Sequence, residues 1–155
     1  MRALLFYCVV IIFAGCKAQT PPDLDEASAT PKQAVQKPTE IQYKRQSRGF
    51  RSIVSFNKDG ITLYQNSETP RTVSYTKDDW EHLQRLSKNI DLSGLSSLKA
   101  PTDKRSYDGA RAAELTLVVN ETSWTSAGFD DGSPPKELSE LVEQLVSLEE
   151  AYFKN

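Results

Sequence analysis

The sequence predicts an α+β fold, with a mostly antiparallel sheet of about five or six strands and two helices packed on one face as a two-layer sandwich. Three observations favour it. Apolar and polar residues alternate through 40–75 and 112–129, as in strands that bury one face. Short turn sequences join these segments, which favours hairpins and therefore antiparallel pairing. Two further segments, 76–90 and 133–152, carry apolar residues at helical spacing.

Four strands are expected in the first half of the domain. Glu40–Ser47 is predicted as an edge strand. In Gly49–Asn57 alternate residues face opposite sides, with one set (Phe50, Ser52, Val54, Phe56) against the other (Arg51, Ile53, Ser55). Lys58-Asp59-Gly60 predicts a hairpin turn, because Gly60 can adopt a positive φ. Ile61–Gln65 and Arg71–Tyr75 are the expected third and fourth strands.

A first helix is predicted to begin after Thr76, which is suited to cap it, and acidic residues follow in the first turn. Its buried stripe consists of Trp80, Leu83, Leu86 and Ile90. Asp91–Tyr107 has no strong period, so we expect a loop or short helical turns pinned to the core by Leu92, Leu95 and Leu98.

Two more strands and a second helix complete the domain. Ala112–Asn120 contains an apolar run expected of a central strand, and Thr122–Phe129 can pair with it across a turn near Glu121. The helix is predicted to start with Ser133 as its cap and Pro134 in its first position. Its expected buried face consists of Leu138, Leu141, Val142, Leu145, Leu148 and Tyr152, whereas Glu137, Glu140 and Glu143 stay in water.

The N-terminus has the form of an export signal. Arg2 precedes an apolar run of twelve residues, Ala3–Ala14. A membrane-spanning helix needs roughly 20 such residues, so the run fits a signal-peptide core. Phe13-Ala14-Gly15-Cys16 resembles the lipobox of bacterial lipoproteins, although Phe13 replaces the usual branched aliphatic residue. This resemblance implies cleavage before Cys16 and lipid on that cysteine; an ordinary signal peptide cleaved after Ala18, or an uncleaved anchor, is the alternative.

The cysteine content agrees with lipidation. Of the two cysteines, Cys8 lies in the segment that cleavage would remove, so Cys16 would be the only remaining thiol. A free thiol is prone to oxidation in an oxidising compartment, whereas a sulfur atom that carries lipid can no longer form a disulfide. Several acyl chains would anchor the protein stably. Lys17 follows the cysteine in place of an aspartate typical of inner-membrane retention, which favours the outer membrane, with the domain facing the periplasm.

Three regions follow along the chain: a signal peptide at 1–15, a lipid-anchored tether at 16–39 and one α+β domain at 40–155. After Cys16 the tether contains four prolines and no aromatic residue in 23 residues, so it cannot bury enough apolar surface to offset its ordering entropy. Such a flexible segment reaches on the order of 25 Å. Its expected role is to space the domain from the lipid.

Few residues in the domain suggest chemistry. It has no cysteine, and its single histidine, His82, is expected on the solvated side of the first helix. We therefore expect neither a zinc centre nor any cofactor. The acids Asp103, Asp108, Asp130 and Asp131 could serve in glycoside hydrolysis or hold calcium, but their spacing does not match a calcium loop. Turn formation, and for Asp130 and Asp131 the dipole of the following helix, are the favoured explanation of these acids.

Charge is distributed unevenly. The whole chain has a formal net charge of -2, which argues against a nucleic-acid binder. Residues 40–51 hold four bases against one acid, net +3, and residues 130–155 hold seven acids against two bases, net -5. The bases Lys44, Arg45, Arg48 and Arg51 could meet lipid phosphates or an acidic partner. A solvated face, or protection of a sheet edge, is the simpler interpretation.

Several short motifs together resemble a family of small uncharacterised bacterial lipoproteins. They are Arg48-Gly49-Phe50, Asp79-Trp80, Ile90-Asp91-Leu92, Ala100-Pro101-Thr102, Asp108-Gly109-Ala110, and Phe129-Asp130-Asp131-Gly132 with Pro134-Pro135. The similarity covers roughly Glu40 to the end. Relatives often have histidine where this chain has Asp131, which argues against a proton-transfer role there. The resemblance implies no known activity and no catalytic residues.

These observations predict a monomeric, non-enzymatic envelope lipoprotein that binds or scaffolds an envelope protein or glycan. Two alternatives stay open. One is a hydrolase with carboxylates around Asp108, Asp130 and Asp131. The other is an inhibitor of an envelope enzyme.

Overall fold

The computed structural model describes residues 37–154. The predicted signal peptide, Cys16 and most of the predicted tether lie outside the described residues. Pro38 and Thr39, at the end of the predicted tether, contact the domain. Pro38 is buried and its carbonyl accepts a hydrogen bond from the Gln84 side chain at 3.2 Å, while the Thr39 amide donates to the Val118 carbonyl at 2.8 Å.

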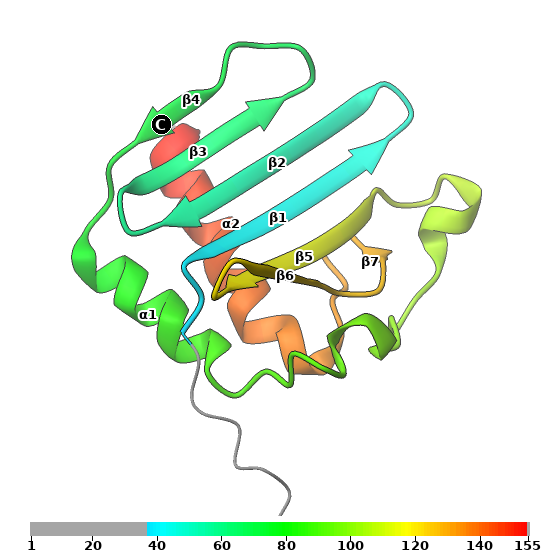
Figure 1. Ribbon diagram of the computed structural model, residues 1–155. Coiled ribbons are helices and arrows are strands. Elements are labelled where there is room, and N and C mark those ends of the chain that lie inside the picture. Colours follow the sequence, from blue (N-terminus) through cyan, green and yellow to red (C-terminus); the bar gives the residue numbers. More distant parts are fainter. Residues whose placement is uncertain (1–36, 155) are drawn as a thin grey trace, which may run out of the picture. The chain divides into compact units, whose positions relative to one another are not determined.

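One antiparallel sheet and two helices form the domain, so the predicted α+β class is confirmed (Figure 1). The strands lie in the order β4-β3-β2-β1-β5-β6, and β7 pairs separately with β5. Their bounds are β1 Glu40–Ser47, β2 Phe50–Asn57, β3 Gly60–Gln65, β4 Arg71–Val73, β5 Ala112–Val119, β6 Thr122–Thr125 and β7 Phe129–Asp130. The helices are α1 Lys77–Ser87 and α2 Ser139–Phe153, with 3-10 turns η1 Leu95–Ser97, η2 Lys104–Tyr107 and η3 Lys136–Leu138.

The sheet has a covered face and an open face. Alternate strand residues point toward the helices on the covered face and form one core with Trp80, Leu83, Leu141 and Leu145. Strand residues of this core are Ile41, Tyr43, Val54, Phe56, Ile61, Leu63, Ala113, Leu115, Leu117 and Phe129. In Figure 1 α2 runs behind the strands and α1 lies at the lower left, below β2 and β3, and none of the helices within residues 37–154 covers the face in front. Within residues 37–154 no helix is long and apolar enough to cross a membrane.

The prediction of β1 as an edge strand is wrong. β1 pairs with β2 on one side and with β5 on the other, where Glu40 lies opposite Val118 and Gln46 opposite Ala112. Residues 40 and 118 are far apart in the sequence, and local alternation contains no information about such long-range pairing. β1 is thus the centre of the sheet, and its charged residues do not protect an edge.

The predicted turn before β3 is confirmed. Asn57 pairs with Gly60, so Lys58 and Asp59 form a two-residue turn. Gly60 has φ +152°, and a Cβ there would lie 2.4 Å from the carbonyl oxygen of Val73. Glycine is therefore needed both for the backbone conformation and for the close approach of β4.

The two helix starts differ from each other. Thr76 caps α1 as predicted, in a capping box in which the Asp79 amide donates to the Thr76 hydroxyl at 3.1 Å. The prediction for the second helix is wrong at its start, because α2 begins at Ser139 after the η3 turn and Ser133 is not its cap. Pro135 explains the delay: a proline disfavours helical geometry in the residue before it, and Pro135 itself is extended with ψ 148°.

The predicted strand Thr122–Phe129 is interrupted. Beyond Thr125 the Leu115 amide donates to the Ser126 side-chain oxygen at 3.0 Å, while the Ser126 amide donates to the Leu115 carbonyl at 2.8 Å. Because a hydroxyl replaces a backbone acceptor there, the regular ladder ends, and the chain resumes pairing only at β7.

Candidate functional site

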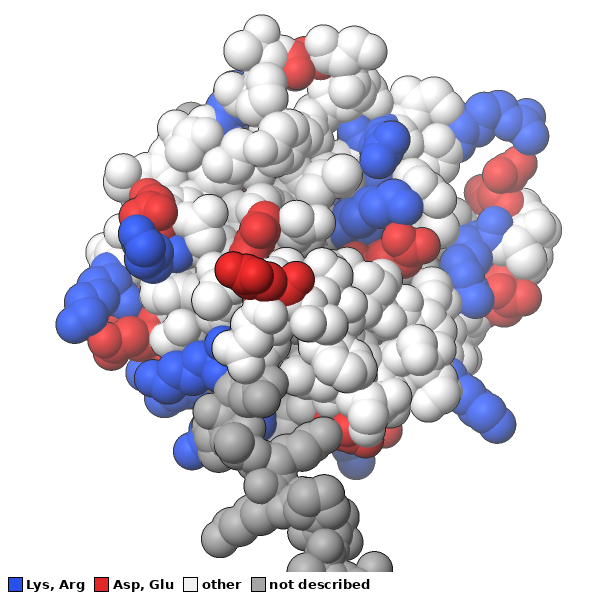
Figure 2. All heavy atoms as spheres, in the orientation of Figure 1, with Lys and Arg blue, Asp and Glu red and all other residues white. Residues whose placement is uncertain are grey.

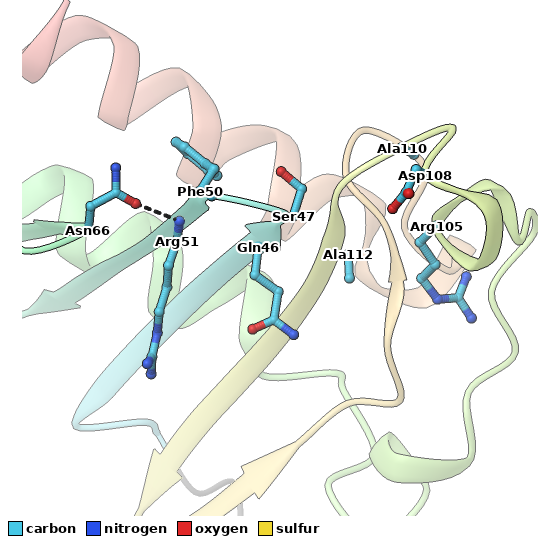
Figure 3. Close-up of a pocket in the computed structure, with 10 residues that line it drawn as sticks. Gln46, Ser47, Phe50, Arg51, Asn66, Arg105, Asp108, Ala110 and Ala112 are labelled. Atoms are coloured by element: carbon cyan, nitrogen blue, oxygen red, sulfur yellow. Dashed lines mark hydrogen bonds between the residues drawn. The ribbon is translucent and has the colours of Figure 1, made fainter.

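A broad groove of about 530 Å³ lies at the rim of the open face, and we call it the rim groove (Figure 3). One wall comes from β2 and the end of β3, with Arg51 and Asn66. The opposite wall comes from η2 and the residues after it, with Arg105 and Asp108, and Ala112 of β5 lies between the two walls. The lining residues are Gln46, Ser47, Gly49, Phe50, Arg51, Asn66, Arg105, Asp108, Ala110 and Ala112.

The strand side of the groove is organised by sheet register and by two turns. Gln46 lies opposite Arg51 on β2 and opposite Ala112 on β5, so the three residues share one row of the open face. Gly49 has φ +74° in the β1–β2 turn. The backbone amide of Arg51 donates a hydrogen bond to the Asn66 side-chain oxygen at 2.8 Å. Asn66 therefore lies next to Arg51 at the outer end of this row.

The opposite wall is held by Asp130, whose side chain is 1% exposed. Its carboxylate accepts hydrogen bonds from the Thr102 hydroxyl at 2.6 Å, the Lys104 amide at 2.7 Å and the Arg105 amide at 3.0 Å. The Arg105 guanidinium donates a further bond at 3.1 Å. Asp130 thereby fastens the start of η2 to the sheet.

Two opposing effects act on the ionisation of Asp130. Burial opposes the charged form, but the hydrogen bonds from Thr102, from the Arg105 and Lys104 amides and from the Arg105 side chain outweigh it and hold the pKa of this carboxyl well below its usual range. A carboxylate kept ionised with four donors around it is a poor general acid. The arrangement supports a structural role for Asp130.

Asp108 ends η2 and lies at the rim. It adopts a left-handed conformation with φ 60°, and its carboxylate lies 3.4 Å from the Arg48 guanidinium. Both side chains are largely exposed, at 74% and 90%. Next to it, a Cβ at Gly109 would lie 2.8 Å from the ring of Tyr107, which is itself exposed. The predicted turn role of Asp108-Gly109 is thus supported, and Asp108 additionally lines the groove.

The free polar groups of the groove are mainly hydrogen-bond donors. Within residues 37–154 the Arg51 guanidinium and the side-chain amide of Gln46 have no hydrogen-bonding or ionic partner. The Arg105 guanidinium, in contrast, forms ion pairs with Asp130 and with Asp103, the latter at 3.1 Å, and donates a hydrogen bond to the Thr102 carbonyl. The groove can therefore bind a polar ligand through Arg51 and Gln46, and it contains no convergent acid–base pair.

Asp131 lies in a different environment from Asp130. Its carboxylate accepts a hydrogen bond from the Tyr43 hydroxyl at 2.8 Å and lies 3.9 Å from the Arg111 guanidinium, which stacks over the Phe50 ring at 4.1 Å. Burial and the neighbouring Asp131 carboxylate raise the pKa of the Tyr43 hydroxyl far above its usual value. Asp131 lines a separate hollow of about 540 Å³ beside α2, together with Arg45 and Glu143.

The four acids identified in the sequence are thus not brought together as one site. Asp103 and Asp130 bind Arg105, Asp108 binds Arg48, and Asp131 binds Tyr43. The explanation of Asp130 and Asp131 by a helix dipole is wrong, because α2 begins only at Ser139. Within residues 37–154 no three His, Cys, Asp or Glu side chains are grouped closely enough to hold a metal ion. His82 is half-buried on α1 and is not one of the residues that line the groove.

The basic segment of β1 and β2 does not form a continuous basic face. Lys44 binds Glu114 at 3.0 Å on the open face, and Arg45 binds Glu149 of α2 on the covered face. The opposite charges of the segments 40–51 and 130–155 therefore partly neutralise each other inside the domain. Gln46, Asn66 and Arg105 were not identified as site residues from the sequence, although the alternation in β2 did place Arg51 on the face opposite Phe50.

Comparison of the chain with protein-family models and with curated proteins gave no match.

Proposed function

We propose that this protein is a lipid-anchored lipoprotein of the bacterial envelope, with a monomeric, non-enzymatic domain that binds an envelope component through the open face of its sheet and the rim groove. The proposal includes lipid on Cys16, placement in the outer membrane facing the periplasm, and kinship with the small bacterial lipoproteins that the motifs resemble. Nucleic acid is not expected as a partner, since the chain has a net charge of -2.

The observation that carries the binding role is the uncovered sheet face with a groove at its rim. An antiparallel sheet can leave one face in water, yet here that face continues into a groove of about 530 Å³ in which Arg51 and Gln46 are unoccupied donors. A pocket with a few polar groups aimed into it is a common form of binding site.

The geometry favours binding over hydrolysis. A hydrolase would need two carboxylates flanking one bond. Asp130 is occupied by four donors, and Asp108 and Asp131 line separate hollows. The carboxylate hydrolase is therefore the weaker candidate.

The test is an affinity capture from detergent-solubilised envelopes, using the full chain produced in a bacterium, with mass spectrometry of its mature N-terminus. We expect diacylglycerol on Cys16 and capture of a specific envelope component. Arg51→Glu should reduce capture at least fivefold, because it reverses the charge of the free groove donor. Arg85→Glu, a matched reversal on exposed α1, should leave capture unchanged. An unmodified Cys16 would disprove the anchor, and equal capture by both variants would disprove the groove's involvement.

A further inference from the structure

A single line of uncharged polar side chains crosses six strands on the open face. Each member lies directly opposite the next in the register: Thr72 opposite Thr62, Thr62 opposite Ser55, Ser55 opposite Gln42, Gln42 opposite Thr116, and Thr116 opposite Thr125. We call these six residues the hydroxyl row. Neighbouring strands lie about 4.8 Å apart, so the row extends on the order of 24 Å across the sheet.

The side chains of the row are held in place before any ligand arrives. The Thr62 and Thr72 hydroxyls are 3.0 Å apart and the Thr116 and Thr125 hydroxyls 2.9 Å apart. Ser55 and Gln42 both donate to one oxygen of Glu40. Each threonine pair shares one hydrogen bond, so it keeps a second hydroxyl proton and spare lone pairs for a ligand. Threonine is stiff at χ1, which lowers the entropy lost on binding.

The face around the row has no net charge. Its charged strand residues are two acids, Glu40 and Glu114, and two bases, Lys44 and Arg51, and Lys44 already binds Glu114 at 3.0 Å. Figure 2 shows the molecule from this side, with uncharged side chains covering much of the surface over the strands. Among the strand residues of this face that the structure describes, only Arg51 at the rim is a base without a partner, so the face offers a charged polymer little electrostatic attraction.

An exposed aromatic ring lies beside the row. Tyr64 is two residues from Thr62 on β3, on the same face, and is 45% exposed. It lies opposite Ile53, so the two form a small apolar platform next to the hydroxyls. Rings and apolar surface of this kind stack on the C–H faces of sugars, while hydroxyl and amide groups bind sugar hydroxyls.

From these properties we propose that the open face binds a neutral, linear glycan laid along the hydroxyl row, with Tyr64 stacking on one sugar. The strand spacing is close to the length of one sugar in an extended β-linked chain, so successive sugars can lie over successive strands. Direct contact is expected at the exposed and half-buried members of the row and not at Ser55, which is only 7% exposed. This inference rests on the proposed envelope-binding function and names the class of its ligand.

A protein partner fits the same surface less well. The centres of protein interfaces are enriched in aromatic residues, methionine and arginine and depleted in serine. The centre of this face consists of threonine, serine and glutamine, and Tyr64 and Ile53 lie to one side. The row therefore matches a ligand that presents many hydroxyl and amide groups and no charge.

The experiment uses a linear hexasaccharide of β-1,4-linked N-acetylglucosamine as the probe, titrated into the isotopically labelled full chain in detergent micelles and followed by NMR. We expect saturable shifts in β1, β2, β3 and β5. Thr62→Val and Thr116→Val, which remove a hydroxyl at constant volume, should each weaken binding about fivefold. Tyr64→Ala should weaken it by a similar factor.

Thr122→Val is the matched control, because Thr122 lies opposite the buried Val119 and is thus on the other face from the row. It should bind as the unaltered chain does, and circular dichroism should show all variants folded. Absence of saturable binding, or equal weakening in Thr122→Val, would overturn the glycan inference. If the chain captured an envelope protein through Thr62 and Thr116 but ignored the oligosaccharide, the glycan inference would fail while the proposed binding function would stand.

Discussion

Neighbouring residues of β1 place positive charge in two contrasting environments. Lys44 on the open face binds Glu114, and their side chains are 29% and 36% exposed. Arg45 on the covered face binds Glu149, and theirs are 12% and 10% exposed. The buried pair joins α2 to the sheet, but Arg45 Nε and Glu149 Oε2 have no hydrogen-bond partner among the residues that the structure describes. On the open face water solvates the charged groups, whereas on the covered face each charged group is stabilised mainly by its partner.

Breaking the buried pair should have the largest effect. Glu149→Ala leaves the Arg45 guanidinium buried without its carboxylate, so we expect the free energy of unfolding to fall by about 3 kcal/mol. Glu114→Ala, the equivalent change on the open face, should cost less than about 1 kcal/mol because water solvates Lys44. Urea denaturation of the two variants measures this contrast.

The double variant Arg45→Met with Glu149→Leu sharpens the comparison. Removing both charges also removes the two unpaired buried atoms, so most of the lost stability should return. If the double variant were as unstable as Glu149→Ala, the loss of stability would come from losing the Arg45–Glu149 interaction and not from leaving the Arg45 charge buried without a partner.

A smaller effect is expected from the carboxylate that holds the groove wall. Asp130→Asn places an amide N–H₂ among four hydrogen-bond donors, and should lower Tm by on the order of 10 °C. Because the folded-state pKa of Asp130 is held below the ordinary 3.8, its contribution is present above that pH and is lost as the pH falls below it. The variant should therefore lose less stability than the unaltered chain between neutral pH and about pH 2.

Asp108→Asn is the control for this prediction, because the Asp108 side chain is exposed and, within residues 37–154, binds only Arg48. Its Tm should stay within about 2 °C of the unaltered chain. Thermal denaturation across pH distinguishes the two aspartates, and identical acid profiles for both variants would refute the role of Asp130.

The smallest effects concern the helix starts in the covered layer. Thr76→Ala removes the α1 capping box and should cost about 1 kcal/mol. Ser133→Ala should cost less than about 0.5 kcal/mol, because Ser133 does not cap α2. Chemical denaturation resolves the two, and a larger loss for Ser133→Ala would contradict the late start of α2.

Much of the fold could be predicted because its signals are local. Alternation in Phe50–Asn57 distinguished the covered from the open face, and Thr76 marked the start of α1 within one residue. The delayed start of α2 also has a local cause, since Pro135 restricts Pro134, but the apolar periodicity from Leu138 onward suggested a continuous helix. Periodicity identifies a helix more reliably than it identifies the end of one.

The candidate site was far less predictable. Asp130 and Asp131 are adjacent in the sequence, yet one fastens η2 and the other binds Tyr43 on β1. The rim groove combines β1, β2, the end of β3, η2 and β5. Two of the short motifs, at Gly49-Phe50 and at Asp108-Gly109-Ala110, contribute residues to it, but nothing in the local sequence shows that they lie on opposite walls of one groove. Only the pairing of β1 with β5 brings the two walls together.

By itself, therefore, the sequence determined the element types, the alternation of buried and exposed residues, the turn at Gly60 and the cap at Thr76, because each depends on interactions between residues close in the chain. The tertiary structure alone decided that β1 is central, that Arg45 meets Glu149, that Asp130 fastens η2, and that six polar residues from six strands lie in one row. Each of these depends on which strand lies beside which, and that choice is made by the packing of the whole chain.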